Sequence, residues 1–159
     1  MAERYYLAYG SNLNIQQMGL RCPFALPIGT VQLHGYELVF KGSKTGSYLT
    51  IQEREDSSVP AAVWRVTSVD EARLDRYEGY PRFYYKKPVE VNVLDRWQEK
   101  NRILTAFVYV MREYRPYGLP SPEYVEVCRK GYMDFDLDLG ELGKALERTR
   151  EEMRKNERG

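Results

Sequence analysis

One glutamate occupies a position where a helix is expected to end. In the stretch Leu74-Asp75-Arg76-Tyr77-Glu78-Gly79, Glu78 directly precedes a glycine that is typical of a helix C-terminus. Backbone carbonyls at that end carry partial negative charge, which disfavours a nearby carboxylate and raises its pKa. A residue chosen for helix stability alone would be lysine or arginine. Glu78 is therefore a candidate general base, although an exposed glutamate beside an arginine explains the same residues.

A second group of residues that could do chemistry lies near the N-terminus, in Tyr9-Gly10-Ser11-Asn12-Leu13. This group interrupts an apolar stretch, and Gly10 would permit a close approach to the backbone. Successive amides at the start of a helix point outward as hydrogen-bond donors. Such a loop suits a carboxylate, or a carbonyl oxygen that becomes anionic, but an ordinary surface turn would look the same.

Other kinds of site have less support. Residues 42–46 contain the residue types of a phosphate-binding P-loop but not their order. Asp134, Asp136 and Asp138 begin like a calcium-binding loop, whose required glycine and glutamate are then missing. His34 is the only histidine and lies far from any nucleophile signature. The two cysteines are too few for a cysteine-rich metal site or a disulfide scaffold.

The composition is that of a globular protein, and it gives no sign of a highly charged binding partner. The chain has 159 residues, 43% of them apolar and 30% charged, which allows a closed core. Its 24 basic and 23 acidic residues leave a formal charge of +1, so nucleic acid and anionic membranes are not favoured as partners. The chain shows no bilayer-length apolar run and no signal-peptide core, and we expect a cytoplasmic protein.

The elements that must position these residues are mostly short strands. Strands are expected at residues 5–9, 28–33, 36–40, 48–52, 61–66, 84–94 and 103–111. The second and third would join at His34-Gly35, and the last two would form a hairpin around the sequence DRWQEKN. Short strands bounded by turn residues favour a barrel or sandwich over regular alternation of strands and helices.

Helices are expected at four places. Residues 14–20 suggest a short helix or turn. Ser68 and Glu71 have the spacing of a capping box, which would start a helix that ends at Gly79. Ser121 followed by proline is typical of a helix start, and a charged C-terminal helix begins at about Leu139. We interpret residues 1–159 as a single α+β domain, a small closed or nearly closed β-barrel with flanking short helices.

The order and spacing of the motifs resemble the γ-glutamylcyclotransferase family, including its AIG2-like bacterial members. YGSNL is followed about 65 residues later by LDRYEGYP, and then by LPSPEYVEVCRKGYMDFDLDL. The similarity also includes QMGLRCPFALPIGTVQLHGYELVF and covers most of the chain. It implies a small mixed β-barrel with flanking helices, in agreement with the pattern of elements.

The resemblance also implies a reaction and a set of site residues. In that reaction, the α-amine of a γ-glutamyl group attacks its own γ-carbonyl, forming 5-oxoproline and releasing the attached amine or amino acid. The catalytic residue would be Glu78, and Tyr124 would help to close the pocket. Tyr84 and Tyr85 compete for one cavity-facing position, because a one-residue slip reverses which side chain points inward, and we choose Tyr84. The backbone amides that hold the substrate would come from Tyr9, Gly10, Ser11, Asn12 and Leu13.

This chemistry needs no metal and no cofactor, and the expected partner is a small γ-glutamyl compound bound by a monomer or homodimer. The leaving group stays open: an amino acid, glutathione, an amine or a biosynthetic intermediate. Arg82, Lys86 and Lys87 could bind a carboxylate of that group, or they could form a solvated strand end. A second hypothesis is a non-catalytic domain that uses the same pocket to bind a metabolite.

Overall fold

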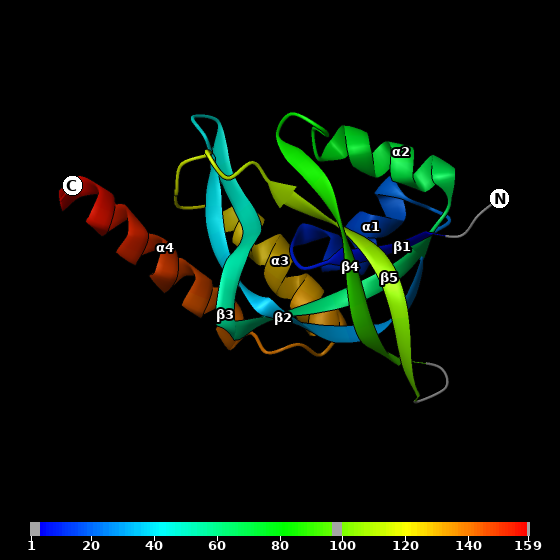
Figure 1. Cartoon of the computed structure of the whole chain (residues 1–159). Helices are drawn as coiled ribbons and strands as arrows, with labels where there is room; N and C mark the ends of the chain where they lie inside the picture. Colours follow the sequence, from blue (N-terminus) through cyan, green and yellow to red (C-terminus); the bar gives the residue numbers. More distant parts are fainter. Residues whose placement is uncertain (1–3, 97–99, 159) are drawn as a thin grey trace.

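In the part of the chain that the structure describes, strands close into a barrel in the order β1-β3-β2-β4-β5 (Figure 1). This computed structural model describes residues 4–96 and 100–158. The pairs β1–β3, β2–β3, β2–β4 and β4–β5 are antiparallel, and β1 meets β5 in parallel at Tyr6 and Phe107. The predicted α+β barrel is confirmed. Its strands are β1 (Arg4–Ala8), β2 (Leu26–Ser43), β3 (Gly46–Val66), β4 (Tyr84–Asp95) and β5 (Asn101–Met111).

The helices flank this barrel. Helix α4 runs along β2, where the Thr149 hydroxyl accepts a 2.9 Å hydrogen bond from the Phe40 amide, and continues away from the barrel to the C-terminus (Figure 1). None of the helices within residues 4–96 and 100–158 combines the length and apolar character needed to cross a bilayer. The helices are α1 (Ile15–Arg21), α2 (Ser68–Tyr77), α3 (Pro122–Asp134) and α4 (Gly140–Arg158), with a short 3₁₀ turn η1 (Ser11–Leu13).

Strands β2 and β3 are longer than the sequence indicates. The prediction that a turn at His34-Gly35 separates two strands is wrong, because β2 continues through it with an irregularity between His34 and Tyr36. Gly35 has a φ of 87° there, which a glycine adopts without strain. Strand β3 likewise joins the predicted strands 48–52 and 61–66 into one. A bulge lets a strand bend without ending, so the turn residues mark a bend in a continuous ladder.

Strands β4 and β5 form the predicted hairpin, paired from Tyr84 with Met111 to Leu94 with Asn101. Residues 97–99 of its predicted turn lie outside the described residues. This hairpin forms the wall of the barrel next to α2, since Lys86 of β4 and Tyr109 of β5 both bind Asp75 of that helix.

Helix α2 is capped one residue earlier than predicted. The Thr67 hydroxyl accepts from the Asp70 amide at 3.1 Å, and the Asp70 carboxylate accepts from the Thr67 amide at 3.3 Å. The predicted pair of Ser68 and Glu71 is therefore wrong, and the Glu71 carboxylate binds basic side chains of two strands instead. At the other end, Gly79 has a φ of 65°, the left-handed cap that the sequence predicts.

Helix α3 packs against the N-terminal loop. Ser121 caps it by accepting from the Tyr124 amide at 3.2 Å, with Pro122 at its first position, as predicted. A Cβ atom on Gly131 would lie 2.5 Å from the Asn14 amide nitrogen, a separation that real Cβ atoms do not adopt. Glycine at this position therefore lets α3 approach the end of η1, which places Tyr124 near the loop.

Candidate active site

Residues from β1, η1, β3, β4, β5, α3 and the end of α2 surround one small pocket, with a cavity volume of about 30 Å³. The predicted residues Tyr9, Gly10, Ser11, Asn12, Glu78, Tyr84 and Tyr124 line it together, although the sequence separates them widely. The remaining lining residues are Tyr6, Leu49 and Tyr109.

The loop after β1 lines this pocket, and its backbone amides are only partly used within the loop. The Leu13 amide donates to the Gly10 carbonyl at 3.0 Å, and the Asn14 amide to the Ser11 carbonyl at 3.0 Å. These are the first bonds of η1, so the amides of Ser11 and Asn12 have no acceptor within the turn. Leu13 differs from its neighbours: its side chain is buried in the core and its amide is used in the turn, so it does not line the pocket.

Glu78 follows the last residue of α2, and its amide donates to the Leu74 carbonyl at 2.8 Å. Its carboxylate Oε1 accepts from the Asn12 side-chain amide at 3.3 Å, and the same amide donates to the Tyr6 hydroxyl at 2.9 Å. Burial raises the pKa of Glu78 to about 7, and the positive charge of Arg21 opposes that rise. A carboxyl with this pKa can accept and return a proton near neutral pH.

Arg21 of α1 fixes the orientation of Asn12. Its guanidinium donates to the Asn12 side-chain oxygen, to Gln17 at 2.9 Å and to the Tyr77 hydroxyl at 2.6 Å, and lies 3.6 Å from the centre of the Tyr77 ring. Since the oxygen of the Asn12 amide faces Arg21, its nitrogen must face Glu78 and Tyr6. The sequence contains no signal that links Arg21 to the site.

The hydroxyls of three tyrosines donate to the protein, not to the pocket. Tyr9 donates to the Tyr109 carbonyl at 2.6 Å, Tyr84 to the Leu49 carbonyl at 2.8 Å, and Tyr109 to the Asp75 carboxylate at 2.6 Å. Burial raises the pKa of all three phenols, so they remain neutral. The atoms that they can offer to a bound molecule are therefore oxygen lone pairs, which are hydrogen-bond acceptors.

Tyr84 is the inward-facing member of the pair Tyr84 and Tyr85. Tyr85 lies on the other side of β4, where its hydroxyl donates to Glu113. Tyr124 lines the pocket from α3, and its hydroxyl accepts from the Leu49 amide at 3.1 Å. The strand register thus resolves the alternative that the sequence leaves open.

Known proteins share this arrangement of sequence and fold. The family model described as gamma-glutamyl cyclotransferase, AIG2-like, matches residues 6–126. A Bos taurus protein named gamma-glutamylcyclotransferase is 32% identical over 141 residues, which cover 84% of this chain and 72% of the relative. Its Homo sapiens counterpart is 30% identical over 151 residues, covering 89% and 78%. A solved structure of a gamma-glutamyl cyclotransferase superposes with a TM-score of 0.75 at 28% identity, covering 91% of this chain and 86% of that one.

The chain belongs to the γ-glutamylcyclotransferase family. The family match begins at Tyr6 and ends just after Tyr124, so it contains every residue that lines the pocket.

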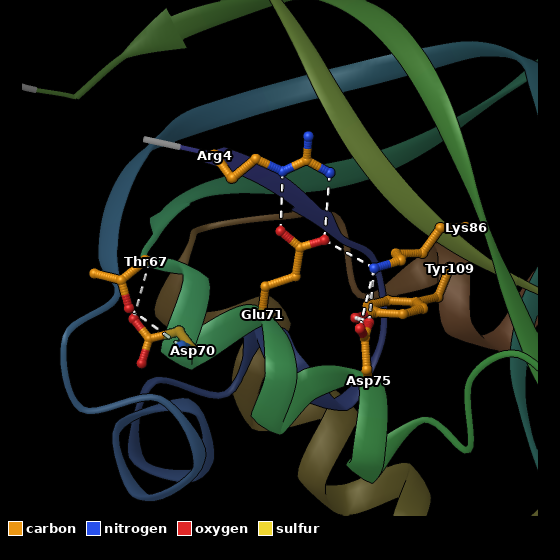
Figure 2. A network of polar contacts seen from close by, with 7 residues as sticks. All are labelled: Arg4, Thr67, Asp70, Glu71, Asp75, Lys86 and Tyr109. Carbon is orange, nitrogen blue, oxygen red and sulfur yellow. Dashed lines mark hydrogen bonds and ion pairs between the residues drawn. The ribbon is translucent and has the colours of Figure 1, made fainter. Parts of the chain in front are cut away.

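In this cyclotransferase-family chain, a line of ion pairs connects the surface to the pocket (Figure 2). Arg4 Nε lies 2.9 Å from Glu71 Oε1, and Lys86 Nζ lies 2.8 Å from Glu71 Oε2 and 3.0 Å from Asp75 Oδ1. Asp75 Oδ1 in turn accepts the hydrogen bond from Tyr109. The network therefore ties α2 to β1, β4 and β5 and holds the hydroxyl of a pocket tyrosine.

The basic residues considered from the sequence lie away from the pocket. Lys86 belongs to the network just described, and Lys87 donates to the Tyr36 hydroxyl. Arg82 is exposed. None of these three is among the described residues that line the pocket.

Sequence reasoning missed Tyr6, Leu49 and Tyr109 as residues that line the pocket. Tyr6 stacks on Phe107 with ring centres 5.4 Å apart, and Tyr109 meets Tyr6 edge-on at 5.6 Å. Aromatic residues within the predicted strands 5–9 and 103–111 were the available signal. That signal does not separate a pocket wall from an ordinary core.

Proposed function

We propose that the protein cyclises the γ-glutamyl group of a small γ-glutamyl compound to 5-oxoproline and releases the attached amine or amino acid. The observation that carries this proposal is a carboxyl with a pKa of about 7, at Glu78, in the same pocket as the donor amides of Ser11 and Asn12. Membership of the cyclotransferase family supports it.

Glu78 would serve as general base and then as general acid. An α-ammonium with a pKa of about 8 must lose a proton before the amine can attack, and an ordinary glutamate near ~4.3 would accept it at a cost of about 5 kcal/mol. With Glu78 at about 7, the difference shrinks to roughly one pKa unit, or about 1.4 kcal/mol. The same carboxyl can return the proton to the leaving nitrogen as its bond to the γ-carbon breaks.

The pocket offers complementary groups to the two ends of the reaction. Amides of Ser11 and Asn12 would donate to an oxygen that becomes negative as the new carbon–nitrogen bond forms. Hydroxyl oxygens of Tyr9, Tyr84 and Tyr109 would accept from the α-amine, because their own protons are already donated elsewhere. Ring closure needs no second reactant, so holding the folded conformer supplies much of the catalysis.

The direct test is to incubate the purified protein with a panel of γ-glutamyl amino acids, amines and peptides and to measure 5-oxoproline. We expect release whose kcat/KM rises with pH through about 7, because Glu78 must be deprotonated in the free enzyme. Binding of these compounds without 5-oxoproline would instead favour a non-catalytic metabolite-binding domain.

A further inference from the structure

A second hollow opens beside Glu78, which we call the outer groove. Its volume is about 350 Å³. Glu78, Tyr84 and Tyr124 line both the outer groove and the inner pocket. The two hollows therefore meet at the proposed catalytic carboxyl. The other residues that line the outer groove are Ser43, Thr45, Tyr48, Arg76, Tyr77, Gly79 and Phe83.

The geometry of the reaction determines which part of the substrate must lie in each hollow. The α-amine, the γ-carbonyl and the carbons between them close into one ring, so they must lie together in the inner pocket. Glu78 must reach both the attacking nitrogen and the leaving nitrogen. The group attached to the leaving nitrogen must then extend past Glu78, and the outer groove is the space on that side.

The walls of the outer groove are largely aromatic. Tyr48 meets Tyr124 edge-on with ring centres 5.2 Å apart and Phe83 at 6.2 Å, and Phe83 lies 5.4 Å from Tyr84. Tyr77 adds a ring whose position is fixed by the Arg21 guanidinium. Rings packed on one another in this way form a continuous aromatic wall, which favours a flat or bulky apolar group lying against it.

The charged residues of the outer groove also restrict which group can bind there. Among the described residues that line it, Arg76 carries the positive charge and Glu78 the negative one. The Arg76 side chain is exposed, and no hydrogen bond or ion pair occupies its guanidinium within residues 4–96 and 100–158. A guanidinium without a partner is well suited to bind a carboxylate through paired hydrogen bonds.

We propose that the outer groove holds the leaving group and selects an amino acid that has a large apolar side chain and a free carboxylate. The aromatic walls would contact the side chain, and Arg76 would bind the carboxylate. An amine without a carboxylate loses the second contact, and one with a further positive charge is repelled by Arg76. This inference rests on the proposed cyclisation and adds its leaving-group specificity.

The experiment compares three substrates: γ-glutamyl-phenylalanine, γ-glutamyl-alanine and γ-glutamyl-phenethylamine, which lacks only the carboxylate of the first. Release of 5-oxoproline is measured with the wild type, Arg76→Gln and the control Arg73→Gln. Arg73 is an exposed arginine of the same helix that does not line the groove.

We expect the wild-type kcat/KM for the phenylalanine compound to exceed that for the alanine compound by roughly tenfold or more, since each added apolar group contributes to binding. Arg76→Gln should lower kcat/KM for γ-glutamyl-phenylalanine by roughly 3- to 30-fold, which is the loss expected when an exposed or partly buried charged contact is removed. Most of the change should appear as a higher KM. The phenethylamine compound should be unaffected by Arg76→Gln, and Arg73→Gln should change none of the three.

Equal rates for phenylalanine and alanine compounds, or an equal effect of Arg76→Gln with and without the carboxylate, would overturn the groove assignment and leave the proposed function intact. If no compound yields 5-oxoproline, the proposed function fails. Calorimetric binding of γ-glutamyl-phenylalanine and γ-glutamyl-phenethylamine to wild type and Arg76→Gln then decides the groove. Carboxylate-dependent binding that Arg76→Gln removes would support it, and equal or absent binding would overturn it.

Discussion

The two ends of helix α2 hold glutamates in opposite surroundings. Near the N-terminal end, burial alone would raise the pKa of Glu71, but hydrogen bonds from Lys86 and Arg4 outweigh burial and lower it. At the C-terminal end, Glu78 has a neutral amide from Asn12 as its neighbour at 3.3 Å, and burial raises its pKa to about 7. The two carboxylates are about two helical turns apart.

The difference shows that the partner sets the role of a buried or half-buried carboxylate. Two cations keep Glu71 ionised, so it can anchor the helix to β1 and β4 but cannot exchange protons near neutral pH. Withdrawal from water raises the pKa of Glu78 more than the positive charge of Arg21 lowers it, which leaves Glu78 between its two protonation states near neutral pH. The contrast between Glu71, whose ion pairs hold the helix in place, and Glu78, the proposed base, can be tested by substitutions at each end of the helix.

The largest effect is expected from Glu78→Gln. Glutamine keeps the size of the side chain but cannot accept the proton, and loss of general acid–base catalysis typically costs ~10²–10⁴-fold in rate. The measurement is 5-oxoproline release under saturating substrate. Glu71→Gln is the matched control and should keep the rate within about threefold, because Glu71 does not line the pocket. Near-wild-type release by Glu78→Gln would refute the assignment of the base.

The second effect concerns stability at different pH values. The folded pKa of Glu78, about 7, exceeds the ordinary value of 4.5, so the folded state binds the proton more tightly. Stability contributed by Glu78 therefore falls as pH rises from about 4.5 to 7, by up to roughly 3 kcal/mol. Urea unfolding of wild type and Glu78→Gln should show the variant gaining relative stability from pH 5 to pH 8. Parallel stability curves would mean that Glu78 titrates normally.

The third prediction compares the adjacent residues Tyr84 and Tyr85 of β4. One side chain faces the pocket and the other faces away from it. Tyr84→Phe removes an inward hydroxyl that donates to Leu49, and it should lower kcat/KM by roughly tenfold, the cost of one lost hydrogen bond in a buried site. Tyr85→Phe removes an outward hydroxyl and should leave kcat/KM within about twofold, since exposed polar contacts contribute little. Equal effects of the two substitutions would contradict the proposed orientation of the site.

The smallest effect is expected from removing the ion pairs of Glu71. The pKa of Glu71 lies below its ordinary value, so its ion pairs stabilise the fold above that value and lose their effect as pH falls through the folded pKa. Glu71→Gln should therefore lower stability at pH 7 by about 1 kcal/mol and have no effect at low pH. The loss should also shrink in high salt. Denaturation midpoints measured with and without salt would test both statements, and a salt-independent loss would point to packing instead.

The sequence predicts the barrel and the two groups of residues that meet in the pocket, because both depend on local chemistry. Local sequence is enough to identify a glutamate before a helix-ending glycine, and a Gly-Ser-Asn loop after a strand. The sequence could not show that β2 and β3 are continuous, since Gly35 is equally suited to a turn and to a bend in a strand.

Two other errors have a similar origin. Thr67 with Asp70 and Ser68 with Glu71 have the same spacing. In the folded chain Thr67 and Asp70 cap the helix, whereas Glu71 binds the distant Arg4 and Lys86. The role of Arg21 likewise depends on contacts with Asn12 and Tyr77 that are formed only in the folded chain. Local patterns therefore identify which residues can react, whereas their partners come from tertiary structure.

The parallel contact between β1 and β5 joins the first strand of the barrel to the last. Tyr9 also donates to the carbonyl of Tyr109, and Tyr132 of α3 donates to the carbonyl of Tyr9 at 3.1 Å. A chain leaving the ribosome thus exposes the loop at residues 10–13 long before the partners of that loop have been made. Contacts between such distant segments form late and slowly. A nascent chain has no complete pocket until α3 has emerged, so any turnover would report that the chain has been synthesised and folded through α3.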